Sequence, residues 1–103
     1  MKSLFAIAAL AALSATALLG VHTRAQDRTP ESGQAAFDRV CRVCHGPEGR
    51  GDGAPRLVPF SREYDEVIAI VREGTGQMPP ISARALPDDG VAQIVAYLKL
   101  LSR

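Results

Sequence analysis

The sequence predicts a small all-α domain that follows an N-terminal export signal. Three segments carry apolar residues at helical spacing, and no segment shows the sustained period-two alternation that a half-buried strand would have. Two stretches rich in Gly and Pro separate these segments, which predicts long irregular loops between three main helices. The length of 103 residues, with 2 Cys and no Trp, is typical of one domain with a thin core.

The charge balance and the Cys count exclude several classes of protein. The chain has 12 Lys and Arg against 11 Asp and Glu, a formal net charge of +1 at pH 7. We therefore expect no nucleic acid among its partners, and two Cys are too few for a disulfide-rich secreted scaffold. Lys99 is the only Lys after Lys2, which excludes a docking face ringed by lysines.

Residues 1–25 have the features of an export signal. Met1-Lys2-Ser3 gives a basic start, and Leu4 to Val21 form an apolar run. The run ends near Thr23-Arg24-Ala25, after which we expect cleavage. The alternative is a membrane anchor, because a run of this length can just span a hydrocarbon core of about 30 Å. In both cases we expect residues 26–103 to form the domain, in the periplasm or otherwise outside the cytoplasmic membrane.

The first helix is predicted from about Pro30 to Cys44. Thr29 can cap it, and Pro30 suits the first helical position, where the missing N–H costs nothing. One face carries apolar residues at positions i, i+3, i+4 and i+7, namely Phe37, Val40, Cys41 and Cys44. Gly46 to Phe60 is rich in Gly and Pro, so we expect an irregular loop after the helix.

Two further helices are predicted. In the second, Ser61 is a candidate cap, acidic residues follow it where a helix N-terminus favours negative charge, and Gly74 ends the helix. Its apolar stripe consists of Tyr64, Val67, Ile68 and Val71. Another Gly/Pro-rich loop runs from Gly74 to Leu86. The third helix begins near Pro87-Asp88, and its stripe consists of Val91, Ile94, Val95, Leu98 and Leu101.

The motif Cys41-Arg42-Val43-Cys44-His45 predicts covalent haem attachment. Two thiols at i and i+3 can add to the two vinyl groups of one haem, while the next residue presents an imidazole to its iron. His45 is therefore the first candidate axial ligand.

Three other functions of the two Cys fit the sequence less well than haem attachment. A structural zinc site needs four ligands, and after loss of His22 the domain offers only two Cys and one His. A thioredoxin-type pair lies at the start of a helix after a strand, whereas these Cys close a predicted helix. A disulfide between them would close a very short loop and so contribute little to stability.

Met78 is the candidate for the second axial ligand. It is the only Met after Met1 and lies in Gly74-Thr75-Gly76-Gln77-Met78-Pro79-Pro80. A Met more often fills a gap in a core, but this Gly/Pro-rich loop has no helical apolar face, and no second His is available.

Residues 26–103 resemble a class I cytochrome c of the small bacterial single-haem type. Gly33 and Phe37 precede Cys41 as in the first helix of that family, and Ile94-Val95-Ala96-Tyr97-Leu98 resembles its last helix. Gln77-Met78-Pro79 resembles the methionine-ligand loop. The resemblance implies the small cytochrome c fold, in which these two helices cross with a close approach at Gly33 and contact between Phe37 and Tyr97.

The resemblance also implies contacts around the haem. Gly53-Ala54-Pro55-Arg56-Leu57 resembles the Gly-x-Pro-x-Leu segment of the family, so the Pro55 carbonyl is expected to accept a hydrogen bond from His45 Nδ1. The domain departs from the family in lacking the Trp and Asn that contact the haem propionates. Arg56 is a candidate replacement, and a solvated Arg56 is the alternative.

Ligation by His45 and Met78 closes both faces of the iron, which favours electron transfer over catalysis. The sequence therefore predicts a haem c protein that carries electrons between a redox donor and a redox acceptor by Fe(II)/Fe(III) cycling. It works either as a diffusing carrier or as the cytochrome subunit of a dehydrogenase or oxidase. One alternative is a haem catalyst or gas-binding protein with a labile sixth ligand, and another is a Cys-x-x-Cys thiol exchange protein. Contact with a membrane is expected only if the N-terminal segment is retained.

Overall fold

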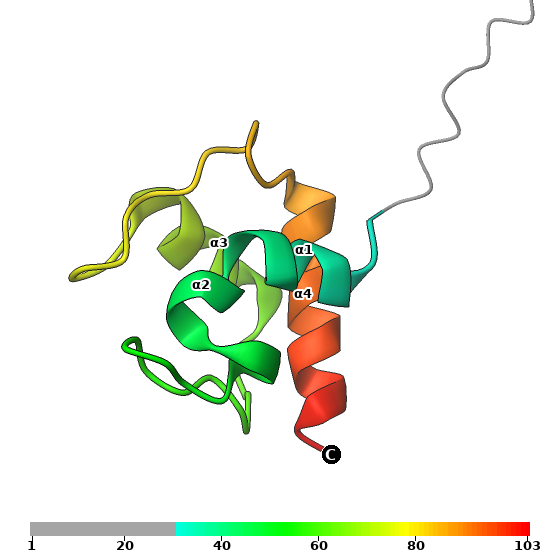
Figure 1. Ribbon diagram of the computed structural model, residues 1–103. Helices are drawn as coiled ribbons and strands as arrows, with labels where there is room; N and C mark the ends of the chain where they lie inside the picture. Colours follow the sequence, from blue (N-terminus) through cyan, green and yellow to red (C-terminus); the bar gives the residue numbers. More distant parts are fainter. Residues whose placement is uncertain (1–30) are drawn as a thin grey trace, which may run out of the picture.

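The computed structural model describes residues 31–103, which fold into helices joined by long loops (Figure 1). Within this range there is no β-strand, which confirms the all-α prediction. The export signal predicted for residues 1–25 and the capping position predicted for Thr29 lie outside the described residues. None of the helices in the described range has the length and hydropathy needed to cross a membrane.

The predicted first helix is two helices that meet at Cys41. Helix α1 spans Gly33–Val40, and α2 spans Arg42–His45. The helix begins later than predicted because the Ser32 side chain accepts a hydrogen bond from Ala35 N at 3.1 Å and so caps it. At Cys41 the φ angle of −103° departs from the usual helical value, and the chain changes direction there.

The second predicted helix is α3, Tyr64–Glu73. It ends at Gly74 as expected, but its start was predicted wrongly, because Glu63 and not Ser61 is the capping position and no side chain caps it. The backbone N–H of Phe60 donates to Ser102 Oγ at 2.6 Å, which fixes the preceding loop to the end of the last helix. The chain stays extended as far as Glu63 and turns into a helix only after it.

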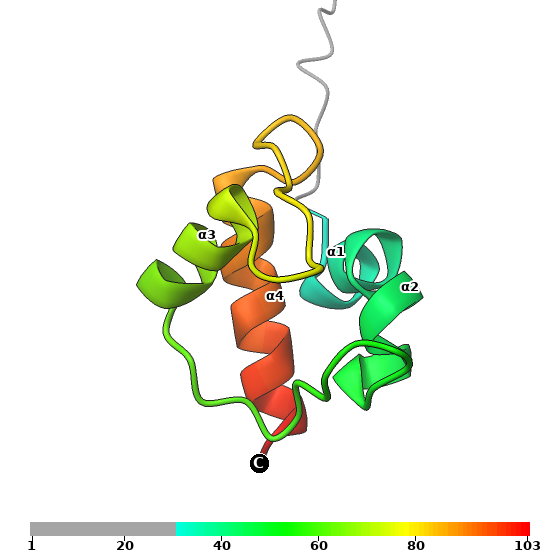
Figure 2. The same cartoon turned by 90° about the vertical axis from the view of Figure 1, so that its left-hand side faces the viewer.

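The third predicted helix is α4, Asp88–Leu101, which crosses α1 (Figures 1 and 2). Gly33 makes this crossing close, because a Cβ atom built on Gly33 would lie 2.1 Å from the Gln93 carbonyl oxygen. Any larger residue would therefore push the two helices apart. The aromatic rings of Phe37 and Tyr97 meet at the same crossing, with centroids 5.8 Å apart and planes inclined at 52°.

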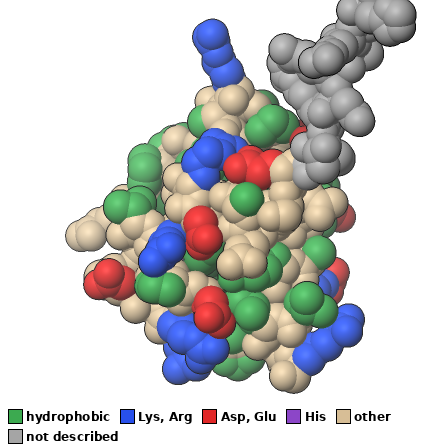
Figure 3. Space-filling model, turned by 45° about the vertical axis from the view of Figure 1, so that its right-hand side comes forward, with side chains coloured by type: hydrophobic (Ala, Val, Ile, Leu, Met, Phe, Trp, Pro, Cys, Tyr) green, Lys and Arg blue, Asp and Glu red, His purple; other side chains and the backbone are tan. Residues whose placement is uncertain are grey.

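One core lies between α1, α3 and α4 and extends to residues of both loops. Its buried members are Ala36, Phe37, Val58, Val71, Leu86, Val91, Ile94 and Leu98. The predicted stripe of α4 is buried except for Leu101, which is half-buried. On the face shown in Figure 3, acidic and basic side chains are interspersed and form no large patch of one sign.

We expect Phe37→Ala to lower the free energy of unfolding by about 3–5 kcal/mol, because the ring is 0% exposed and its removal leaves a cavity at the helix crossing. Denaturant unfolding of the holoprotein measures this change. Leu100→Ala is the control, since Leu100 is 59% exposed on α4, the other helix of the crossing, and should cost about 1 kcal/mol or less. A loss below about 1 kcal/mol for Phe37→Ala would contradict its role in the core.

Candidate functional site

The main candidate site is a cleft of about 920 Å³ that is lined by α1 to α4 and by both long loops. Its walls are mostly apolar, and they include six core residues: Phe37, Val71, Leu86, Val91, Ile94 and Leu98. The volume falls in the range of about 300–1,000 Å³ that is typical of ligand and cofactor sites. The cleft therefore divides the core and can take a large apolar group.

Cys41, Cys44 and His45 all line this cleft. The turn of chain at Cys41 and the short helix α2 bring the three residues to the same wall. Cys41 is half-buried and Cys44 is exposed, and both are free thiols. The arrangement leaves both sulfur atoms available for bonds to a group in the cleft.

The His45 ring is oriented by a hydrogen bond to the chain. Its Nδ1 atom lies 2.8 Å from the Pro55 carbonyl oxygen, the contact that the Gly-x-Pro-x-Leu resemblance implies. A carbonyl oxygen can only accept, so Nδ1 carries a proton, and Nε2 is the ring atom that a neutral imidazole would present to a metal. Such a hydrogen bond fixes the tautomer of a metal-ligating His and makes it more basic.

The loop around Pro55 is itself fixed to α2. Gly51 N donates to the His45 carbonyl at 2.7 Å, and Ala54 N donates to the Cys44 carbonyl at 3.1 Å. These bonds hold the Pro55 carbonyl next to the imidazole.

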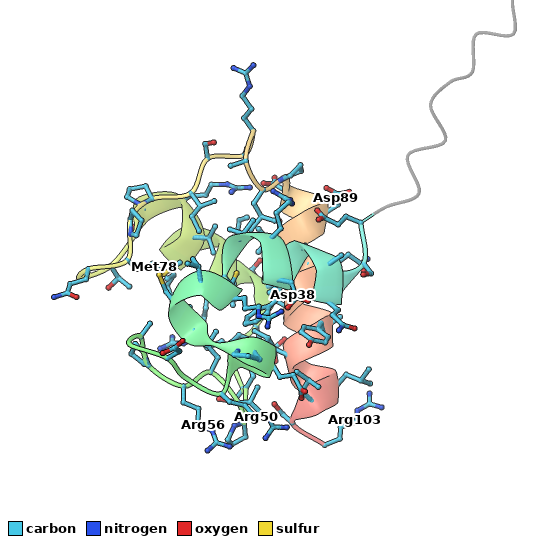
Figure 4. All side chains as sticks on the ribbon, viewed as in Figure 1. Asp38, Arg50, Arg56, Met78, Asp89 and Arg103 are labelled. Atoms are coloured by element: carbon cyan, nitrogen blue, oxygen red, sulfur yellow. The ribbon has the colours of Figure 1, made fainter. Side chains whose placement is uncertain are left out.

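Met78 also lines the cleft, from the loop that follows α3. Its side chain is half-buried and packs against the core. The structure thus brings Met78 to the same cleft as His45, although 33 positions separate them in the numbering. Figure 4 shows Met78 on this loop, well away from the labelled arginines.

The structure does not place Arg56 in the cleft lining. Its Nε donates to the Val58 carbonyl, and Figure 4 shows its side chain at the lower edge of the view. Arg62 lines the cleft instead and is the only Lys or Arg among the described residues to do so. No sequence pattern distinguishes Arg62 from the other arginines. Its position at the cleft depends on the path of the chain between Phe60 and α3.

The Cys41 thiol is poorly suited to thiol exchange. Burial raises the pKa of Cys41 to about 11, so the thiol is protonated at neutral pH. Reactive thiols in exchange proteins have a lowered pKa, since the thiolate is the nucleophile. Among residues 31–103, moreover, no three or more His, Cys, Asp or Glu side chains form a group that could hold a metal ion in the manner of a zinc site.

The residues of the cleft fit a covalently bound haem. The apolar walls suit the porphyrin, the two free thiols suit its vinyl groups, and the imidazole and thioether suit its iron.

Comparison with known proteins supports the class I cytochrome c family that the sequence resembles. Residues 28–98 match the family model described as cytochrome C oxidase, cbb3-type, subunit III. The chain is 31% identical over 72 residues to cytochrome c-551 of Bacillus subtilis, with 68% of this chain and 61% of that protein covered. It is 35% identical over 71 residues to the cytochrome c subunit of 4-cresol dehydrogenase from Pseudomonas putida, with 68% and 60% covered. The chain thus spans less than two thirds of the length of these two relatives.

Solved structures agree with these sequence relatives. A crystal structure of p-cresol methylhydroxylase with substrate bound contains a chain that is 32% identical, with a TM-score of 0.62 and coverage of 70% of this chain and 95% of that one. OmcF, at 22% identity and a TM-score of 0.56, shares the fold. The relatives are small c-type cytochromes, which supports electron transfer over the alternative of a haem catalyst or gas-binding protein. The chain therefore belongs to the class I c-type cytochromes, whose cofactor is covalently bound haem c with iron.

Proposed function

We propose that this protein is an exported single-haem electron carrier in which Cys41 and Cys44 bind the haem vinyl groups and His45 and Met78 ligate its iron. The observation that carries the proposal is the cleft itself, which gathers these four side chains from α2, the turn before it and the loop after α3. Export rests on the basic and apolar pattern of residues 1–25.

The side chains that we assign determine how the site works. The bound haem supplies one-electron Fe(II)/Fe(III) cycling. His45 donates from Nδ1 to the Pro55 carbonyl and so presents Nε2 in a fixed orientation. The neutral Met78 thioether and the apolar walls disfavour the extra positive charge of the ferric form, which raises the reduction potential. With His45 and Met78 both bound to the iron, no position would be open to a substrate.

Mass and spectrum of the protein, expressed with haem-maturation machinery, test this proposal. We expect a mass equal to residues 26–103 plus one haem, and a low-spin spectrum with the thioether-to-ferric charge-transfer band. A mass that retains residues 1–25 would indicate a retained anchor. A high-spin spectrum, or a colourless product with two titratable thiols, would contradict the proposed ligation or attachment.

We further propose that Arg62, and not Arg56, faces the haem propionates. Arg62 lines the cleft, pairs with Glu66 at 3.2 Å, and is exposed enough to turn toward a carboxylate. A cation beside the propionates opposes oxidation of the iron. We expect Arg62→Gln to lower the reduction potential by about 20–60 mV, since 59 mV corresponds to a tenfold change in a one-electron equilibrium. Potentiometric titration checks this. Arg56→Gln is the control, and a larger shift for Arg56→Gln would reverse the assignment.

We propose that the partners are redox proteins that dock at the cleft mouth mainly through apolar contact. Val43 lies at the cleft and is 82% exposed. Nearby charges offset each other, because Arg50 pairs with Glu48 at 3.1 Å and Asp52 lies on the cleft lining. Long-range steering by the protein's charge should therefore be weak.

We expect electron transfer with the physiological partner to depend only weakly on salt, and Val43→Asp to lower the rate more than Arg42→Gln. Rates measured across a salt series test this, because the Debye length falls from about 30 Å at 0.01 M to about 3 Å at 1 M. Ile81 suits this test less well, since it is half-buried and packs against the core. A steep salt dependence with the opposite order of variants would contradict apolar docking.

A further inference from the structure

The loop that carries Met78 has few backbone bonds to the rest of the protein. Thr75 N donates to the Met78 carbonyl at 3.1 Å, and Met78 N donates to the Thr75 carbonyl at 2.9 Å. Both hydrogen bonds join residues within the loop, so they do not attach it to the rest of the protein. Pro79 and Pro80 have no N–H to donate. Apart from the packing of its side chain against the core, the position of Met78 therefore depends on the two ends of the loop, Gly74 and Ile81.

The Gly74 end is held by a close approach. Gly74 caps α3 with a φ of 72°, and its N–H donates to the Ile70 carbonyl at 2.8 Å. A Cβ atom built on Gly74 would lie 2.7 Å from the Met78 carbonyl oxygen. The loop can turn back over the end of α3 only because a glycine is present.

The Ile81 end is held by two consecutive residues of α3. Ile81 N donates to the Val71 carbonyl at 2.7 Å, and the Ile81 carbonyl accepts from Arg72 Nη1 at 3.1 Å. The second Arg72 nitrogen, Nη2, donates to Asp88, the first residue of α4. The Arg72 side chain is 24% exposed and that of Asp88 is 69% exposed, so the bond to the Ile81 carbonyl is the better shielded of the two contacts. One guanidinium thus joins the Met78 loop to α3 and to α4.

We propose that Arg72 is a positioning residue that determines how firmly Met78 is held at the iron. The proposal rests on the proposed function, in which Met78 is an axial ligand. The planar guanidinium presents separate donors in a fixed geometry, so it can bind a carbonyl and a carboxylate at once. A neutral thioether contributes no charge attraction of its own to the iron bond, and loops open more readily than packed helices. Arg72 therefore opposes opening of the loop, while the α1–α4 packing does not depend on it.

The test compares Arg72→Gln with Arg84→Gln in the full holoprotein. Arg84 is an exposed arginine a few residues after Ile81, and no hydrogen bond or ion pair within residues 31–103 involves it. Carbon monoxide binding to the ferrous form reports how often Met78 leaves the iron. We expect Arg72→Gln to bind carbon monoxide about tenfold faster than Arg84→Gln, the factor expected for loss of about 1.4 kcal/mol of hydrogen bonding.

Two further measurements separate a positioning role from a structural one. On heating, the thioether-to-ferric charge-transfer band of Arg72→Gln should disappear before the helical circular dichroism does, whereas in Arg84→Gln the two should be lost together. Arg72→Lys keeps the charge but has a single nitrogen, so its binding rate should fall between those of Arg72→Gln and Arg84→Gln. If Arg72→Gln fails to fold, Arg72→Lys against Arg84→Gln gives the same comparison.

Equal carbon monoxide rates in the Arg72 and Arg84 variants would overturn the role of Arg72. In that case the charge-transfer band of the unmodified protein would still be present. Absence of the band from the unmodified protein would instead overturn ligation by Met78, and the role of Arg72 with it.

Discussion

Replacing both Cys41 and Cys44 by Ser, or His45 by Ala, is expected to yield little or no folded holoprotein. Six of the residues that form the core also line the cleft, so the core is complete only when an apolar group lies between its walls. The described domain is small, and the stability of small domains is marginal, on the order of 5–15 kcal/mol in total. Without the thioether bonds or the iron ligand on α2, the haem is no longer held in the cleft. The free energy of folding that the helix packing alone supplies should then be too small to keep the domain folded.

Helical circular dichroism, haem stain after denaturing electrophoresis and thermal unfolding measure this loss. Val43→Ala is the matched control, because Val43 lies in the same short helix between the two Cys and is 82% exposed. This variant should retain covalent haem and unfold cooperatively. A haem-free Cys41→Ser,Cys44→Ser protein that is well folded and melts cooperatively would show that the helices need no haem.

The sequence was sufficient to predict the helices that carry strong apolar stripes. Helix α4 begins at Asp88, as expected from Pro87-Asp88, and buries Val91, Ile94 and Leu98. Apolar residues at helical spacing mark the buried face of a helix, so a helix of this kind can be predicted without knowing what packs against it. The crossing at Gly33 came from the family resemblance, because a glycine in a helix does not reveal what approaches it.

The features that the sequence missed depend on contacts between distant parts of the chain. The division of the first helix at Cys41 leaves the apolar spacing intact, so periodicity cannot reveal it. The late start of α3 follows from the bond between Phe60 and Ser102, which are 42 positions apart. Arg62 and Arg56 look alike in the sequence, and only the path of the loop decides which of them lines the cleft.

Met78→Ala is expected to keep the haem attached through Cys41 and Cys44 and to lose the sixth ligand. The reduction potential should then fall, on the order of 0.1 V, within the range of about 0.8 V that axial ligands span. The charge-transfer band should disappear, and carbon monoxide should bind the ferrous form rapidly. These changes follow if the thioether stabilises ferrous iron and closes its second face.

Met78→Leu and Gln77→Ala separate ligation from packing. Met78→Leu keeps the apolar volume beside the core but removes the sulfur. As in Met78→Ala, the charge-transfer band should disappear and the reduction potential should fall, but the loss of stability should be smaller. Gln77→Ala changes an exposed neighbour in the same loop and should leave the band and the potential unchanged. Lys99 is held by Glu63 at 2.7 Å and is absent from the cleft lining, so it is not placed to replace Met78. An unchanged potential and spectrum in both Met78 variants would therefore mean that a residue other than Met78 ligates the iron. The proposal that the Met78 loop closes the second face of the iron would then be wrong.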